Sequence, residues 1–177
     1  MRNTEALLAL FAEHRVQATW FVLGEVAEAF PGVVRAIAAA GHELGVHGFH
    51  HHRLFQLTPA AFRASIQRAK AVVEQAAGQR VLGHRAVAFS LSASTWWAVE
   101  ILVDLGFEYD SSVFPFRGTQ YGLPRAPLTP YRVDTAQGSL TEVPLPVLDF
   151  GPLRLPCGGG VSATLSAVVH AMGDPEP

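Results

Sequence analysis

Four of the chain's eight histidines lie in one short segment, between His47 and His52. Imidazole is neutral near pH 7 and is the commonest protein ligand for transition metals, so this segment is the first candidate for a metal site. His47 and His51 are four residues apart, and Gly48 lets the backbone turn so that the second ring can approach the first. His50 and His52 flank this pair and are expected to point away from it. The spacing alone is equally compatible with a solvated loop of incidental metal affinity.

The elements around the cluster place it at the end of a strand. Residues 42–46 are short and partly apolar and follow Gly41, which predicts a strand with His47 at its C-terminal end. Arg85 and Asp110 come at the ends of two further predicted strands, at residues 80–85 and 107–109. In α/β proteins the C-terminal ends of parallel strands form the rim that carries the active site. We therefore expect the histidines, Arg85 and Asp110 to lie on one rim.

Strand and helix signals alternate along the first two thirds of the chain. Residues 17–23 are uncharged, which predicts a strand buried on both faces as in a parallel sheet. Apolar residues at helical spacing predict helices at residues 3–15, 25–40 with a break at Pro31, 58–78 and 92–105. Thr4 and Thr58 are the expected N-caps of the first and third helices. This alternation predicts a parallel α/β architecture with right-handed crossovers.

The last third of the sequence has a different character. Residues 117–156 are rich in proline and glycine. Within them, residues 121–124 and 127–131 are predicted to form an ordered irregular loop over the rim, and residues 140–150 one or two strands. The glycines at 158–160 lack the spacing of phosphate-binding loops. Residues 162–172 are predicted to form a weak helix, and residues 173–177 a frayed end.

Composition limits the class of protein. A chain of 177 residues that is 49% hydrophobic and 16% charged is long enough for one domain with a buried core. A net charge of -2 without a basic run argues against a nucleic-acid partner. Cys157 is the single cysteine, which excludes an internal disulfide, and is expected to be a buried or loop thiol. Neither a signal peptide nor a membrane span is apparent, so we expect a soluble, cytoplasmic protein.

Several segments together resemble a known family. Residues 18–24 (ATWFVLG), 38–44 (AAAGHEL) and 47–51 (HGFHH) resemble polysaccharide deacetylases of the NodB-homology type, also grouped as carbohydrate esterase family 4. Residues 83–86 (GHRA) and 109–115 (YDSSVFP) are similar to the subgroup associated with bacterial exopolysaccharide systems. The similarity covers residues 3–160.

The resemblance implies both a fold and a reaction. Such proteins adopt a distorted (β/α) barrel and remove N-acetyl groups from carbohydrate polymers, using a divalent metal, commonly zinc, held by one aspartate and two histidines. By position, His47 and His51 correspond to the two metal ligands. Arg85 corresponds to a catalytic-site arginine that braces the catalytic aspartate, and Asp110 opens a motif that lines the substrate groove. An N-acetylated polysaccharide or oligosaccharide is then the expected partner.

The sequence departs from the family pattern at its beginning and end. Family members start with a strand whose aspartates supply the general base and one metal ligand, but no acidic residue precedes Glu5 here. Val46 and Val87 replace a small hydroxyl residue and a proline, and His170 is the single candidate for the late general acid. We therefore expect one truncated domain over residues 1–177, with a divergent tail at 161–177 and an incomplete barrel. The unpaired sheet edge would favour dimers or aggregates.

Two functions from different classes follow. The first is a metal-dependent hydrolase that removes N-acetyl groups from a carbohydrate polymer, with low or no activity as this polypeptide stands. The second is a non-catalytic relative that binds glycan or metal. Without its aspartate partner, Arg85 is expected to be solvated or paired with another acid such as Asp110, because an unpaired buried guanidinium costs several kcal/mol.

Overall fold

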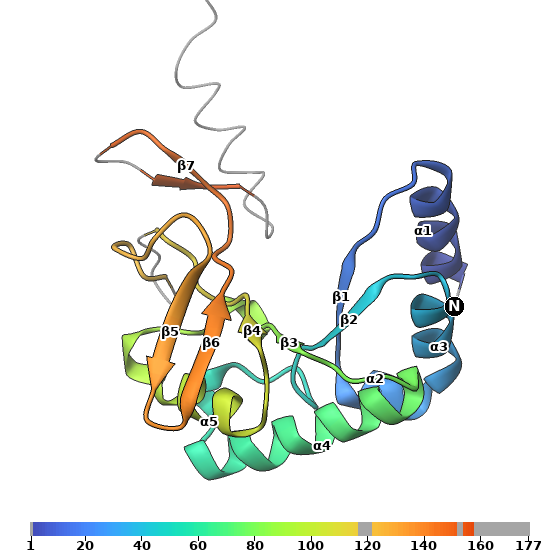
Figure 1. Cartoon of the computed structure of the whole chain (residues 1–177), viewed down its shortest axis with the longest axis horizontal. Coiled ribbons are helices and arrows are strands. Elements are labelled where there is room, and N and C mark those ends of the chain that lie inside the picture. The colour runs from blue at the N-terminus through green and yellow to red at the C-terminus, as the bar shows by residue number, and fades with distance from the viewer. Residues whose placement is uncertain (1, 117–121, 152–153, 158–177) are drawn as a thin grey trace, which may run out of the picture.

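A six-stranded sheet with helices on one face organises the chain (Figure 1). The structure is a computed structural model that describes residues 2–116, 122–151 and 154–157. The strands are β1 (Thr19–Val22), β2 (Glu43–Val46), β3 (Gly83–His84), β4 (Tyr109–Asp110), β5 (Tyr131–Thr135) and β6 (Gly138–Glu142), with β7 (Val147–Asp149) and β8 (Arg154–Pro156) in a separate hairpin. The α-helices are α1 (Arg2–Glu13), α2 (Gly24–Ala29), α3 (Pro31–Ala39), α4 (Pro59–Ala77) and α5 (Trp97–Asp104).

The strand order is β1-β2-β3-β4-β6-β5, so the first four strands lie side by side in chain order. Strands β1 to β4 and β6 run parallel, and β5 joins β6 as an antiparallel edge strand. Helices connect β1 to β2, β2 to β3 and β3 to β4, as the alternation of signals predicted. The sheet curves without β1 meeting β5, which gives an open, barrel-like α/β arrangement among the described residues (Figure 1).

Local sequence signals set several of the helix ends. The hydroxyl of Thr58 accepts a hydrogen bond from the N–H of Ala61 at 3.2 Å, and Pro59 begins α4, as predicted. Gly78 ends α4 in the left-handed conformation at φ 70°. The predicted break falls at Phe30, between α2 and α3, with Pro31 as the first residue of α3.

Packing against one face of the sheet forms the core. Helices α3 and α4 lie against β2, while α5 lies against β6. The buried apolar residues come from the helices and from alternate strand positions; they include Val34, Ile66, Val73, Val46 and Leu102. The opposite face carries polar and aromatic residues in partial contact with solvent, such as Thr19 and Tyr109.

Two predictions about individual elements were wrong, and one strand was not predicted. β1 is not buried on both faces: of its four residues only Val22 is buried, because β1 is an edge strand and one face of the sheet is open. Thr4 lies inside α1 and does not cap it, since the helix begins at Arg2. β5 was not predicted, and its first residue, Tyr131, was assigned to the irregular loop. Its pairing with β6 depends on the turn between the two strands, because β5 has no strong pattern of its own.

Arg154 ties the irregular region to the rest of the molecule. Its guanidinium donates to the backbone carbonyl oxygens of Pro115, Pro124 and Ala126 at 3.3, 2.7 and 3.2 Å. The predictions for residues 117–121, for the glycines at 158–160, for the tail after residue 160 and for His170 lie outside the described residues. Among the described helices, none combines the length and the apolar character needed to cross a membrane.

Candidate functional site

The register of the parallel strands decides which side chains reach the open face. Val46, His84, Asp110 and Glu142 lie in one row across β2, β3, β4 and β6. Successive side chains of a strand point to opposite faces. All four residues of this row are buried on the face that the helices cover, with exposed fractions of 0 to 2%.

The next position along each strand points to the open face. His47, Arg85 and Ser111 each continue the ladder, because their N–H groups donate to the carbonyls of Val22, Val46 and His84 at 2.9, 3.0 and 2.9 Å. This second row places an imidazole, a guanidinium and a hydroxyl side by side at the C-terminal edge of the sheet. The predicted common rim for His47 and Arg85 is therefore present.

His47 is held in the tautomer that a metal ligand needs. Its Nδ1 lies 2.7 Å from the carbonyl oxygen of Arg85, and because a carbonyl can only accept, Nδ1 carries the proton. The Nε2 lone pair is then left for another partner. Burial lowers the pKa of His47 to about 4, although the bond to the Arg85 carbonyl opposes this shift. The ring is therefore uncharged at neutral pH.

His51 returns toward His47 after the turn at Gly48, whose φ is 91°. The ring centres of His47 and His51 lie 5.5 Å apart. Two imidazoles that bind one tetrahedral zinc ion through bonds of about 2.1 Å have ring centres roughly 5 Å apart. The separation of the ring centres is compatible with one shared ion. His50 is directed elsewhere, since its Nδ1 lies 2.7 Å from the carboxylate of Glu25.

The donor set for a metal is nevertheless small. Across residues 2–116, 122–151 and 154–157, no three His, Cys, Asp or Glu side chains are grouped so that they could hold an ion together. His47 and His51 supply two neutral nitrogen ligands, whereas a catalytic zinc usually has three protein ligands. Two neutral ligands alone would give an open site that binds a metal weakly.

Arg85 is held by Ser111. Its Nε donates to the carbonyl oxygen of Ser111 at 2.9 Å, and its Nη2 donates to the Ser111 hydroxyl at 2.7 Å. The guanidinium carbon lies 4.3 Å from the centre of the Phe21 ring, a cation–π contact. Burial lowers the pKa of Arg85, with opposing contributions from Asp110 first and then from Tyr109 and Glu142. Of the two expected alternatives, a solvated Arg85 or one paired with an acid such as Asp110, the second is not formed among the described residues, where Arg85 is bonded to Ser111.

Asp110 is fully buried and does not line a groove in this structure. Its Oδ1 accepts hydrogen bonds from His84 Nδ1 and from the Ser112 hydroxyl, each at 2.7 Å. Its position in the row that faces the helices explains the difference from the prediction: Asp110 and Arg85 point to opposite faces of the sheet. A group in this position is too deep to contact a polymer.

Two residues that the sequence reasoning missed organise this region. Ser111 anchors Arg85, and Glu142 accepts hydrogen bonds from the N–H groups of Ser112 and Val113 at 3.1 and 2.9 Å. Burial, and after it the charge of Asp110, raises the pKa of Glu142 to about 10, so its carboxyl is protonated at neutral pH. Strand alternation could have identified Ser111, because the residue after Asp110 shares a face with Arg85.

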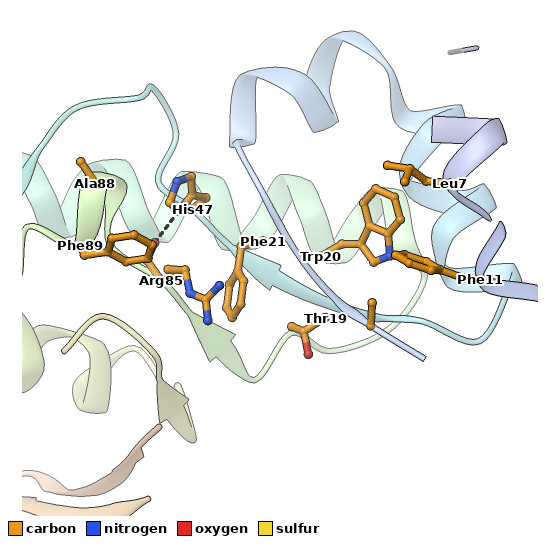
Figure 2. Close-up of a pocket in the computed structure, with 10 residues that line it drawn as sticks. Leu7, Phe11, Thr19, Trp20, Phe21, His47, Arg85, Ala88 and Phe89 are labelled. Carbon is orange, nitrogen blue, oxygen red and sulfur yellow. Dashed lines mark hydrogen bonds between the residues drawn. The ribbon is translucent and has the colours of Figure 1, made fainter. Parts of the chain in front are cut away.

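A cavity of about 460 Å³ opens beside His47 and Arg85 (Figure 2). His47, Arg85 and Phe89 form one end, and Phe21 of β1 lies next to the guanidinium (Figure 2). The other end is apolar and is lined by Leu7, Phe11 and Trp20 among others. The cavity thus joins the polar rim to the outer edge of β1.

Comparison with known proteins gives two adjoining family matches. Residues 1–109 match the family described as polysaccharide deacetylase, and residues 111–165 match a domain of unknown function, DUF3473. The boundary falls within β4, and β4 pairs with β6, so both matched regions contribute to the same sheet. The first match covers more than half of the chain.

Individual relatives point to the same family. The peptidoglycan deacetylase of Helicobacter pylori is 29% identical over 120 residues, which are 65% of this chain and 38% of the relative. The peptidoglycan-N-acetylglucosamine deacetylase of Bacillus cereus is 36% identical over 75 residues, 42% of this chain and 27% of the relative. A crystal structure of a Mycobacterium smegmatis protein assigned to the polysaccharide deacetylases superposes with a TM-score of 0.68 and 28% identity, over 96% of this chain and 58% of that one. The chain therefore spans well under half the length of these two curated relatives.

Proposed function

The chain belongs to the polysaccharide deacetylase family. On that premise, we propose that it carries part of a metal-dependent site that removes N-acetyl groups from a carbohydrate polymer. One observation supports this proposal most strongly. The rings of His47 and His51 lie 5.5 Å apart at the C-terminal edge of the sheet, beside the Arg85 guanidinium. The names of the relatives suggest peptidoglycan or a chitin-like oligosaccharide as the class of substrate.

Each residue of the site has a role that follows from its contacts. His47 and His51 would hold the cation through ring nitrogens, and the Arg85 carbonyl keeps His47 in the required tautomer. A bound divalent cation, zinc by preference, would polarise the acetyl carbonyl and activate a water molecule. Arg85 is fixed by Ser111 and Phe21 and places positive charge where it would stabilise a developing negative charge.

The same geometry supports low hydrolytic activity for this polypeptide. Two neutral ligands bind zinc weakly, and a third protein ligand is missing from the described residues. Asp110 is buried against His84, so it cannot accept the proton of an attacking water molecule. A non-catalytic function in glycan or metal binding is the second candidate, and the small donor set favours it.

Zinc titration by calorimetry and an assay of acetate release from an N-acetylglucosamine oligomer test these candidates together. We expect uptake of one zinc ion per chain, with loss of that uptake in His47→Gln, and little acetate. Uptake with no acetate at all would support the non-catalytic candidate, and measurable acetate that depends on His47 would support the hydrolase. A chain that binds no zinc would contradict both the metal site and the proposed chemistry.

We also propose that the two matched regions work as one domain. The pairing of β4 with β6 supports this, because a sheet shared across the boundary joins the two regions through backbone hydrogen bonds. Limited proteolysis should therefore release no stable fragment that ends near Asp110. Recovery of a folded fragment of residues 1–109 would contradict a single domain.

A further inference from the structure

Two hydrogen bonds anchor the segment that carries His51, one on each side of it. Before it, the carbonyl oxygen of Phe49 accepts from the N–H of Glu25 in α2 at 3.1 Å. After it, the N–H of Leu54 donates to the side-chain hydroxyl of Ser90 at 3.0 Å. His51 therefore lies on a short span whose two ends are fixed by different parts of the fold.

The second anchor depends on a buried hydroxyl. Ser90 is 1% exposed, and besides accepting from Leu54 its hydroxyl donates to the carbonyl oxygen of Val87 at 2.7 Å. The carbonyl oxygen of Ser90 in turn accepts a hydrogen bond from the hydroxyl of Thr95 at 3.0 Å. A buried hydroxyl that both donates and accepts in this way has one preferred orientation. Ser90 thus links the histidine segment to the turn at Val87.

The turn that Ser90 closes has a strained backbone. Ala88 and Phe89 both have φ 51°, in the left-handed region. Two successive non-glycine residues are unfavourable there, because each Cβ approaches the following carbonyl oxygen, and such a conformation persists only where its surroundings hold it. The bond from the Ser90 hydroxyl to the carbonyl of Val87 spans this turn. Both strained residues line the cavity beside His47 (Figure 2).

We propose that Ser90 is a positioning residue of the candidate metal site and fixes two parts of it with one hydroxyl. Through Leu54 it holds the segment that carries His51. Through Val87 it holds the turn that places Phe89 in the cavity. Ser90 acts through backbone groups and contacts no ligand itself, so it sets geometry in advance of binding. The inference rests on the proposed function, because it names what fixes the geometry of that site.

Ser90→Ala in the full chain tests the proposal, with Val73→Ala as the control. Val73 is fully buried near the end of α4, at the edge of the sheet opposite the rim, because α4 ends there before β3 begins. Its truncation should lower the stability of the core without releasing either anchor of the histidine segment. Urea unfolding establishes that both variants are folded and measures how much stability each has lost.

The first readout is made by NMR on the zinc-free chain. In Ser90→Ala the amide of Leu54 loses its acceptor and should exchange with solvent about tenfold faster, the factor that corresponds to one ordinary hydrogen bond. The nuclear Overhauser effect between the rings of His47 and His51, whose centres lie 5.5 Å apart, should weaken in the same variant. In Val73→Ala both signals should remain as in the wild-type chain.

The second readout is the affinity for zinc, measured by calorimetry. Ser90→Ala should bind zinc about tenfold more weakly, because affinity falls in proportion to the fraction of chains that hold His51 in position. Equal affinities of Ser90→Ala and the wild-type chain, an unchanged contact between the two rings, or an equal loss in Val73→Ala would overturn the proposal. A wild-type chain that takes up no zinc would contradict the proposed function, and the contact between the rings would then decide the role of Ser90.

Discussion

Arg85 and Asp110 differ by one step in strand register, and that step separates their roles. Asp110 pairs in register with His84, so both side chains point into the core. Arg85 and Ser111 each follow by one residue and point to the open face, where they bond to each other. The buried carboxylate of Asp110 therefore stabilises the fold beneath the rim. The guanidinium of Arg85 faces the cavity, where it can contact a ligand.

At the residue scale, the first prediction concerns the histidine pair. Replacing either His47 or His51 by Ala should weaken zinc binding at least tenfold, because even the loss of a group that only hydrogen-bonds to a metal ligand typically lowers metal affinity by roughly 10- to 100-fold. His52→Ala is the matched control in the same loop and should change the affinity little. Calorimetric titration with zinc near pH 7.5 measures all three variants. An equal loss of zinc affinity in the His52 variant would indicate that the whole loop binds zinc unspecifically, and would contradict a defined site at His47 and His51.

A second prediction concerns Glu142, which is protonated in the folded state. Its carboxyl ionises in the unfolded chain above about pH 4.3, so unfolding releases a proton and the free energy of unfolding falls as the pH rises above that value. The slope from this one group is at most about 1.4 kcal/mol per pH unit. Glu142→Gln keeps a neutral donor next to Asp110 and should remove this slope.

Urea unfolding at several values between about pH 5 and 8 measures this effect. Glu108→Gln is a suitable control, because Glu108 is 60% exposed in its side chain and should leave the slope unchanged. If the free energy of unfolding changed with pH equally in the wild-type chain and in the Glu142 variant, Glu142 would be shown to ionise normally in the folded state. The raised pKa of Glu142 in the folded state would then be ruled out.

At the element scale, the glycines of the central strands make room for aromatic rings on the open face. A Cβ on Gly83 would lie 2.1 Å from the Tyr109 ring, and one on Gly45 would lie 2.6 Å from the Phe21 ring. Tyr109 in turn donates a hydrogen bond to Glu43 at 2.8 Å. The two rings thus cover the middle of the sheet and support Arg85 from below, because Phe21 is its stacking partner.

Substituting one of these glycines should therefore destabilise the sheet. Gly83→Ala forces the Tyr109 ring away. It should lower the free energy of unfolding by about 3 kcal/mol, near the upper end of the range for overpacked cores. Gly32→Ala is the control, because a Cβ there meets only the end of the Arg35 side chain at 4.0 Å and alanine favours the helix. Urea unfolding compares the two variants. If Gly83→Ala lowered the free energy of unfolding by less than about 0.5 kcal/mol, the Tyr109 ring would be shown to move aside without destabilising the sheet.

The elements were predictable where a local signal defined them. Thr58 with Pro59, the break at Pro31, and Gly78 each fixed a helix end through capping or backbone geometry that acts over a few residues. The exposure of β1 and the existence of β5 depend on which strand lies beside which. Such contacts join residues far apart in the chain and have no short-range pattern.

At the scale of the whole molecule, the sequence predicted which residues lie near the candidate site but not the face of the sheet to which each side chain points. The strand ends placed His47 and Arg85 on one rim, and the turn at Gly48 was expected. The roles of Ser111 and Asp110 depend on the exact phase of β4 relative to β3, which two-residue strands do not reveal in the sequence.

The most direct test is a crystal structure of the chain with bound zinc, located by anomalous scattering. We expect one ion with Nε2 of His47 and a ring nitrogen of His51 each at about 2.1 Å, on the same face of the sheet as the Arg85 guanidinium. An ion held instead by His50 and His52, or rings of His47 and His51 that turn away from each other, would contradict the shared metal site on which the proposed function depends.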